Sequence, residues 1–258
     1  MNQQQVQKEW KKLQKKEQIF VNRNLEQKTA VWQEKIEKYV PEKLESTLNN
    51  AFFKAFELIF QKGTGIIEKT YNREKKEQDY KINEFAAEVK NSRKSLRVFE
   101  KRAKNTRYVN SAVSTAEGIG MGLLGMGLPD IPLFLAVLLK SIYEIALAYG
   151  FSYDTKSEQL YILKVIETSL SHGEALVSGN VGLNRMEKNV EQISDTEFKS
   201  QMKKTSDVLA KEMLYLKFVQ GIPVVGMAGG ISDMVYQKKI TDYAALKYQR
   251  RFLEGKIL

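Results

Sequence analysis

The sequence predicts an all-α fold, and three observations support this. No convincing run of alternating apolar and polar residues of strand length occurs anywhere in the 258 residues. The first 117 residues contain only two glycines and one proline, a scarcity that is typical of long helices. Apolar residues there recur at steps of three, four or seven, which is the spacing of an amphipathic helix. We therefore expect a multi-helix fold of seven or eight helices.

Three long amphipathic segments are expected in the first 117 residues. The first covers about residues 4–39 and is stopped by Pro41. The second places its apolar face within residues 44–60 and ends at the turn of residues 63–65. The third contains no breaker, and its apolar side chains at helical spacing are expected in the core rather than stacked on nucleic-acid bases. These side chains are Tyr71, Ile82, Phe85, Val89, Leu96 and Phe99.

An apolar helix is expected after the glycine-rich stretch GIGMGLLGMGLPDIP at residues 118–132. Asp130 suits its N-cap, and Pro132 is tolerated in a first helical turn. The helix is expected to run to Tyr149, with Gly150 closing it as a C′ residue.

Two capping boxes predict the helices that follow. Thr155 with Glu158, and Ser194 with Glu197, each have the Ser/Thr-x-x-Glu spacing in which a side chain accepts from a free backbone amide. Residues 178–192 lie between these two helices and are the most loop-like interval, because Gly and Asn are frequent there.

The positive charge lies in the first part of the chain. Residues 1–110 hold 25 Lys/Arg against 15 Asp/Glu, whereas residues 111–258 hold 16 of each, which accounts for the net charge of +10. The chain is therefore divided into basic amphipathic N-terminal helices, 1–110, and a glycine-rich helical core, 111–258, expected to form one continuous globular unit. Such asymmetry indicates contact with an anionic membrane surface or with nucleic acid, or else a solvated helix face.

The composition removes several classes of chemistry. No cysteine occurs and His172 is the only histidine, so disulfides and zinc sites of imidazole and thiolate are excluded. At the end of a helix, His172 is expected to contact terminal carbonyls rather than to serve a catalytic triad. No cofactor, no catalytic residue and no metal ligand is predicted, so an enzyme is not favoured.

Three interpretations of residues 118–132 are open. Residues 120–125 match G-x-G-x-x-G, but no strand precedes them and Pro129 interrupts the helix that should follow, which disfavours a dinucleotide loop. A membrane span is disfavoured by Asp130, whereas a re-entrant or interfacial hairpin is compatible with it. We favour packing, because small residues at G-x-x-x-G spacing let two helix backbones approach closely. Gly118 and Gly122 have this spacing, and Gly125 and Gly127 belong to the same glycine-rich stretch.

A second glycine-rich stretch repeats this pattern. Gly226 and Gly230 have the same spacing, and Asp233 follows Gly230 as Asp130 follows Gly127. We therefore expect two glycine-rich helical hairpins that pack on each other. The two aspartates are expected to cap the next helices, and a paired carboxylate site is the alternative.

The chain resembles the EcsC family of bacterial proteins over roughly residues 100–254. The resemblance rests on the glycine-rich stretch, Asp130 with Pro132, the close at Tyr149-Gly150, the run Tyr161-Ile162-Leu163 and a C-terminal segment with Ala244 and Arg251. Lys140-Ser141 departs from the Arg that many members carry before the Ile. The resemblance implies a bacterial cytoplasmic context, and it brings no catalytic residue.

The expected function is that of a non-enzymatic accessory protein in the bacterial cytoplasm, and association with the inner face of the membrane or with a membrane transporter is compatible with it. The partners expected are an anionic membrane surface or a membrane protein complex. A soluble nucleic-acid-binding or protein-binding module, and an enzyme with a carboxylate pocket at Asp130 and Asp233, are the alternatives.

Overall fold

The computed structural model describes residues 2–25, 42–112, 130–186, 193–219 and 231–257. All regular elements in these ranges are helical, and no strand is found among them, so the all-α prediction is confirmed. The elements are α1 (Gln3–Leu25), α3 (Glu42–Leu58), a π-helical turn (Ile59–Gly63), α4 (Thr64–Glu68), α5 (Arg73–Lys90), α6 (Arg93–Ala112), α8 (Asp130–Ala148), α9 (Lys156–Leu170), α10 (Gly173–Arg185), α11 (Asp195–Val219) and α12 (Ile231–Ile257).

Nine of the described helices have 13 residues or more, against the seven or eight expected. One reason is that the third segment is broken. Asn91 adopts a left-handed conformation with φ 46°, and its N–H donates to the Ala87 carbonyl, so α5 ends there and α6 begins two residues later. Asn is one of the few residues other than Gly that adopts this conformation readily.

The other reason is α10, which occupies the first half of the interval predicted as a loop. A Cβ on Gly179 would lie only 2.6 Å from the Thr168 Oγ1 of α9. This glycine therefore allows close packing between helices rather than a turn. Residues 63–65 likewise do not end the second helix, because a π-helical turn carries the chain on into α4.

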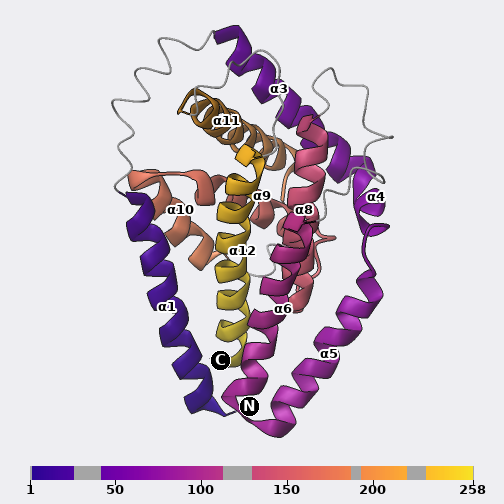
Figure 1. Cartoon of the computed structure of the whole chain (residues 1–258), viewed down its shortest axis with the longest axis vertical. Coiled ribbons are helices and arrows are strands. Elements are labelled where there is room, and N and C mark those ends of the chain that lie inside the picture. The colour runs from indigo at the N-terminus through magenta and orange to yellow at the C-terminus, as the bar shows by residue number, and fades with distance from the viewer. Residues whose placement is uncertain (1, 26–41, 113–129, 187–192, 220–230, 258) are drawn as a thin grey trace.

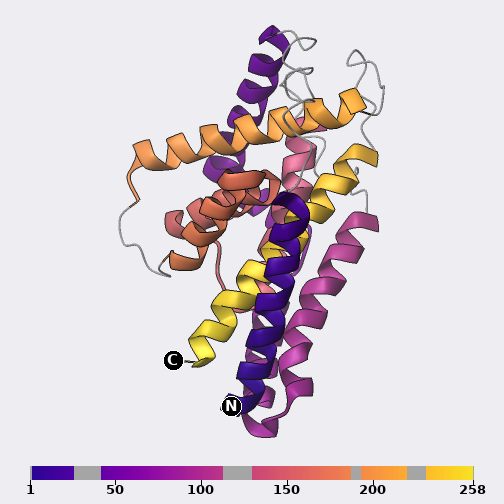
Figure 2. The ribbon, with the colours of Figure 1, turned by 90° about the vertical axis from the view of Figure 1, so that its left-hand side faces the viewer.

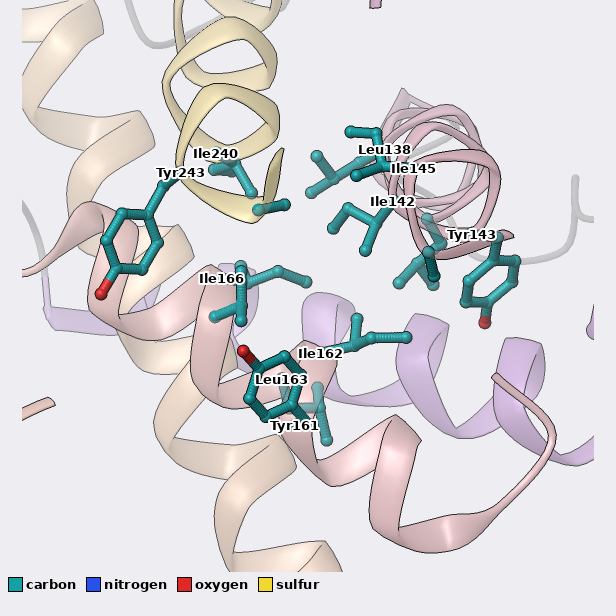
Figure 3. Packing of buried hydrophobic residues seen from close by; sticks show 14 of the residues in the cluster. Leu138, Ile142, Tyr143, Ile145, Tyr161, Ile162, Leu163, Ile166, Ile240 and Tyr243 are labelled. Carbon is teal, nitrogen blue, oxygen red and sulfur yellow. The ribbon is translucent and has the colours of Figure 1, made fainter. Parts of the chain in front are cut away.

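Helix α8 lies at the centre of the fold. It packs against α3, α5, α6 and α12, and nearly all of its described side chains are buried. Figure 3 shows Leu138, Ile142 and Ile145 of α8 facing Ile240 of α12 and Ile162 and Ile166 of α9. The apolar helix predicted from the sequence is thus the centre of a protein core.

The basic N-terminal helices surround this core. Helix α12 contacts α1 and α6, and α5 contacts α6 and α8 at the edge of the molecule (Figure 1). Helix α11 packs on α3 and α9, and it crosses the direction of α1 and α6 steeply (Figure 2). One hydrophobic cluster joins residues of both parts of the chain, from Val6 of α1 to Leu253 of α12.

Candidate functional site

The glycine-rich segments lie outside the described residues, and with them Gly118, Gly122, Gly125, Gly127, Gly226 and Gly230. Asp130 is the first residue of α8 and Asp233 the third residue of α12. Both helices begin at the same end of the molecule (Figures 1 and 2). The two carboxylates are not among the described side chains, so capping and the paired carboxylate site both stay predictions.

The predicted end of α8 is confirmed. The Phe151 N–H donates to the Ala146 carbonyl at 2.9 Å and the Gly150 N–H to the Leu147 carbonyl at 3.0 Å, which together form a Schellman motif. Gly150 has φ +82°, and a Cβ there would lie 2.3 Å from the Tyr80 ring of α5. Glycine at this position thus serves both the turn and the packing of α5. Tyr149 and Pro132 are buried.

Among the described helices, α8 is also the one long and apolar enough to cross a membrane. Its stretch Ile131–Ala148 has a mean hydropathy of 1.9, but 83% of that stretch is buried inside the protein. A core helix of a water-soluble domain has the same composition. The apolar character of α8 is therefore explained by packing.

Helix α5 carries the opposite feature, an apolar stripe on its outer face. Ile82, Phe85 and Val89 are 65%, 69% and 64% exposed. Their spacing of three and four places them on one face of the helix. The prediction that these three residues lie in the core is wrong, because α5 packs through its other face, where Tyr80 and the fully buried Ala87 lie.

The charged residues of α5 also differ between its packed sides and its outer side. On the packed sides, Lys76 pairs with Glu144 of α8 at 2.9 Å and Asp79 with Arg102 of α6 at 2.6 Å. On the outer side, Lys75, Lys81 and Lys90 are exposed and form no ion pair with the residues that the structure describes. Glu74 and Glu88 are exposed there too. The outer face combines an apolar stripe with a small excess of lysine.

A second charged feature lies between α1 and α6, where three lysines surround one carboxylate. The Glu100 side chain accepts from Lys16 at 2.6 Å and lies 3.0 Å from Lys104 and 3.5 Å from Lys12. Burial raises the pKa of Glu100, but hydrogen bonds and Coulomb attraction from Lys16 and Lys104 outweigh it and hold that pKa at about 2. Burial also lowers the pKa of Lys16; Glu100 opposes this shift, whereas Lys12 and Lys104 add to it.

Lys16, Lys104 and Glu100 of this cluster line a cleft of about 270 Å³. Its walls come from α1, α6 and α12, and Tyr149 at the end of α8 also contributes. Arg23 is a further cation in the wall, and Phe20, Ala245 and Leu246 supply apolar surface. Among the described residues that the sequence marked as candidate site residues, Tyr149 alone lines this cleft.

Two buried ion pairs of α12 hold the fold together. Arg251 contacts both oxygens of Glu158 at 2.6 and 2.9 Å, and its guanidinium lies 4.3 Å from the ring centre of Tyr161. Lys247 bonds Glu17 of α1 at 2.7 Å. Burial lowers the pKa of Lys247 to about 8, and the attraction of Glu17 opposes this shift. Glu158 and Glu17 each form an ion pair with a basic side chain, so neither carboxylate is unpaired.

Both capping boxes are confirmed at the N-cap. The Glu158 N–H donates to the Thr155 hydroxyl at 3.2 Å, and the Glu197 N–H donates to the Ser194 hydroxyl at 3.1 Å. The prediction for His172 is wrong: its Nε2 lies 3.0 Å from Glu212 of α11, and its side chain makes no capping bond. The tight packing of α9, α10 and α11 brings this pair together.

The described residues contain no group of three or more His, Cys, Asp and Glu suited to a metal ion.

A hydrogen-bonded cluster contains the side chains of Tyr71, Tyr153 and Glu68. The two tyrosine hydroxyls are hydrogen-bonded to each other, and the Tyr153 hydroxyl donates to the Glu68 carboxylate at 2.7 Å. Burial raises the pKa of Tyr71 and of Tyr153 above the ordinary value of 10, so both hydroxyls stay protonated and are poor nucleophiles. This cluster ties α4 to the segment after α8.

The model of the EcsC protein family matches residues 4–253, nearly the whole chain. The chain belongs to the EcsC family. It is 25% identical over 225 residues to Protein EcsC of Bacillus subtilis (strain 168), a match that covers 86% of this chain and 84% of that protein. No solved structure matches significantly.

Several described residues that carry the EcsC resemblance are buried. These are Tyr161, Ile162 and Leu163 of α9 and Ala244 of α12, and the buried Arg251 forms the pair with Glu158. These positions support the fold rather than a site. At the departure from the EcsC pattern, Lys140 is buried and its ammonium donates to the Thr70 carbonyl at 3.3 Å. A cation at this position therefore ties α8 to the end of α4.

Proposed function

We propose that this EcsC-family chain is a non-enzymatic accessory protein that docks reversibly on the anionic inner face of a bacterial membrane. The observation that carries the proposal is the outer face of α5. Ile82, Phe85 and Val89 are about two-thirds exposed at helical spacing on a helix whose other face packs on the core. Large apolar residues grouped on one face mark an interaction surface more often than single exposed ones do.

The chemistry of this face suits a lipid interface. Moving the exposed surface of a large apolar side chain out of water contributes about 1–2 kcal/mol. Each lysine near an anionic surface adds about 1 kcal/mol. Lys75, Lys81 and Lys90 lie beside the stripe, and the exposed Glu74 and Glu88 offset part of their charge. Helix α6, which follows α5 in a hairpin, carries seven Lys/Arg and one acidic residue. Four of these cations form ion pairs: Arg93 and Arg97 with Glu9, Arg102 with Asp79 and Lys104 with Glu100. The total favours binding that is salt-sensitive and reversible, as expected of an interfacial helix.

Sedimentation with vesicles of phosphatidylcholine, with and without phosphatidylglycerol, tests the proposal. The variant Ile82→Ser/Phe85→Ser/Val89→Ser is compared with a control, Val177→Ser/Val181→Ser/Val235→Ser. The control side chains are also exposed but lie on α10 and α12. We expect the wild type and the control to pellet with anionic vesicles at low salt, and the α5 variant to stay in solution.

Equal pelleting of the α5 variant and the wild type would overturn docking through α5. Recovery of the wild type in solution with both vesicle types would overturn membrane docking itself. Salt-sensitive binding to DNA or RNA without binding to vesicles would instead favour the nucleic-acid-binding module.

A further inference from the structure

The cleft between α1, α6 and α12 brings together residues that are far apart in the sequence. Lys16 and Arg23 come from α1, Glu100 and Lys104 from α6, and Leu246 from α12. Helix α12 contacts both α1 and α6, and it lies between them in the view of Figure 1. The docking face on α5 shares none of these residues, so the cleft is a separate feature.

The cleft has more positive than negative charge. Lys12, Lys16 and Lys104 all lie within 3.5 Å of a single carboxylate, Glu100. Lys12 lies outside the lining and also faces Glu9 at 3.9 Å. The charged lining therefore consists of the cations Lys16, Lys104 and Arg23 and the acids Glu100 and Asp242. The remaining acid in the lining is Asp242, which pairs with Lys238 on its own helix at 2.7 Å.

These ammonium groups are already held in position. Lys16 and Lys12 are about a third exposed and Lys104 about half. Partial burial lowers the pKa of the Lys16 ammonium; Glu100 opposes this shift, and repulsion from Lys12 and Lys104 adds to it. A second anion at the rim would relieve this repulsion without any new ordering of the side chains, which is the condition for preorganised binding.

The rest of the cleft is apolar. Ile19 and Phe20 of α1, with Ala245 and Leu246 of α12, form surface beside the cations. Phe20 is fixed by stacking on Tyr243, with the ring centres 4.7 Å apart. A ligand that suits this lining has an anionic end with several oxygen acceptors and a small neutral or apolar remainder.

We propose that this cleft binds an organic phosphomonoester, with its phosphate at Lys16, Lys104 and Arg23 and its remainder against Phe20 and Leu246. A phosphomonoester carries about two negative charges near neutral pH, so it can pair with more than one of the three lining cations, Lys16, Lys104 and Arg23. Its oxygens accept charge-assisted hydrogen bonds from lysine and arginine. A cleft of about 270 Å³ admits a headgroup-sized molecule.

A phosphomonoester can come from a lipid headgroup or from a soluble metabolite, and the probes separate these sources. Calorimetric titration of the full chain, without vesicles, uses dihexanoyl phosphatidic acid, glycerol 3-phosphate and inorganic phosphate. Binding of the lipid alone assigns the cleft to a headgroup, with its chains on the apolar wall. Equal binding of glycerol 3-phosphate assigns it to a soluble ligand. No binding of any probe at millimolar concentration overturns the proposal.

Charge variants identify the site. Arg23→Gln changes an exposed side chain at the end of α1 and is expected to weaken binding about tenfold, the effect of one charge-assisted hydrogen bond. Lys16→Gln/Lys104→Gln is expected to abolish it. The control Lys11→Gln/Lys15→Gln removes the same charge from exposed positions of α1 outside the cleft and is expected to bind as the wild type does.

Glu100→Gln is expected to strengthen binding of the probe, whereas the lysine and arginine variants weaken it. Removal of the competing carboxylate frees the three lysines, so this variant is expected to bind the probe more tightly and to gain more thermal stability from it. A role of the cluster in stability alone predicts no such gain, and unchanged or weaker binding overturns the proposal. The α5 triple-serine variant must bind the probes normally, so failure of the cleft is distinguishable from failure of the membrane proposal.

Discussion

Helices α5 and α8 have nearly the same length, 18 and 19 residues, and pack against each other, yet they use apolar side chains in opposite ways. The strongly apolar α8 is buried, whereas the polar α5 exposes its largest apolar residues. Composition alone would assign α8 to the membrane and the apolar residues of α5 to the core. Whether the apolar side chains of a helix are buried depends on how many helices pack against it. Helix α8 has neighbours on several sides, whereas α5 packs through one face.

The largest loss of stability is expected from a substitution in the buried core. Phe99→Ala on α6 removes a fully buried ring that packs between Tyr80 of α5 and Phe252 of α12. The free energy of unfolding is expected to fall by about 3–5 kcal/mol, because a large cavity is left. Urea denaturation followed by circular dichroism measures it, and a loss below 1 kcal/mol would contradict the packing of α5 on this ring.

Arg251→Met tests the buried ion pair of α12 and is expected to cost about 3–5 kcal/mol, because Glu158 is left buried without its cation. The double variant Arg251→Met/Glu158→Met is expected to recover part of this loss. If the double variant is less stable than the single one, the pair does not act as described.

Gly150→Ala tests the junction between α8 and α5. Its φ of +82° strains any side chain, and the added Cβ meets the Tyr80 ring. We expect a loss of about 2–4 kcal/mol from these two causes together. Tyr80→Ala should relieve the clash but leave the strain of the turn. Equal losses for Gly150→Ala in both backgrounds would argue against the contact between α5 and this turn.

The pH dependence of stability tests the cluster at Glu100. Its pKa is lowered from 4.5 to about 2 in the folded state, so the folded state binds fewer protons than the unfolded state between these values. The stabilisation is present above about pH 4.5 and is lost as the pH falls towards 2. We expect a contribution on the order of 2 kcal/mol, because each pKa unit is worth about 1.4 kcal/mol and the exposed lysines reduce it. Glu100→Gln should flatten the stability profile between pH 4.5 and 2, and an unchanged slope would contradict this assignment.

The smallest effect on stability is expected at the exposed stripe. Phe85→Ala should change the free energy of unfolding by no more than about 0.5 kcal/mol, as for other surface positions, although the same substitution at Phe99 is severe. Vesicle binding should nevertheless weaken. A loss of stability comparable to that of Phe99→Ala would show that Phe85 is covered in solution.

The functional signals were only partly visible in the sequence. The charge asymmetry pointed to residues 1–110, and α1 and α6 carry much of that charge. Helical spacing predicts that the stripe on α5 lies in the core, because this spacing is the same for a buried and an exposed face. The cleft around Glu100 was missed, since Lys16, Lys104 and Leu246 lie on three separate helices and no short motif joins them. The hairpin prediction at Gly118 to Gly127 lies outside the described residues.

Local sequence patterns were enough to predict the helical class, the capping of α9 and α11 and the end of α8 at Gly150. Each depends on residues close together in the chain, where local hydrogen bonds and helix period act. Only the tertiary structure decided which apolar face is covered, that Gly179 packs within a helix, and that three lysines surround Glu100. Those outcomes depend on which helices become neighbours, and that choice is made by burial of the whole core rather than by any one segment.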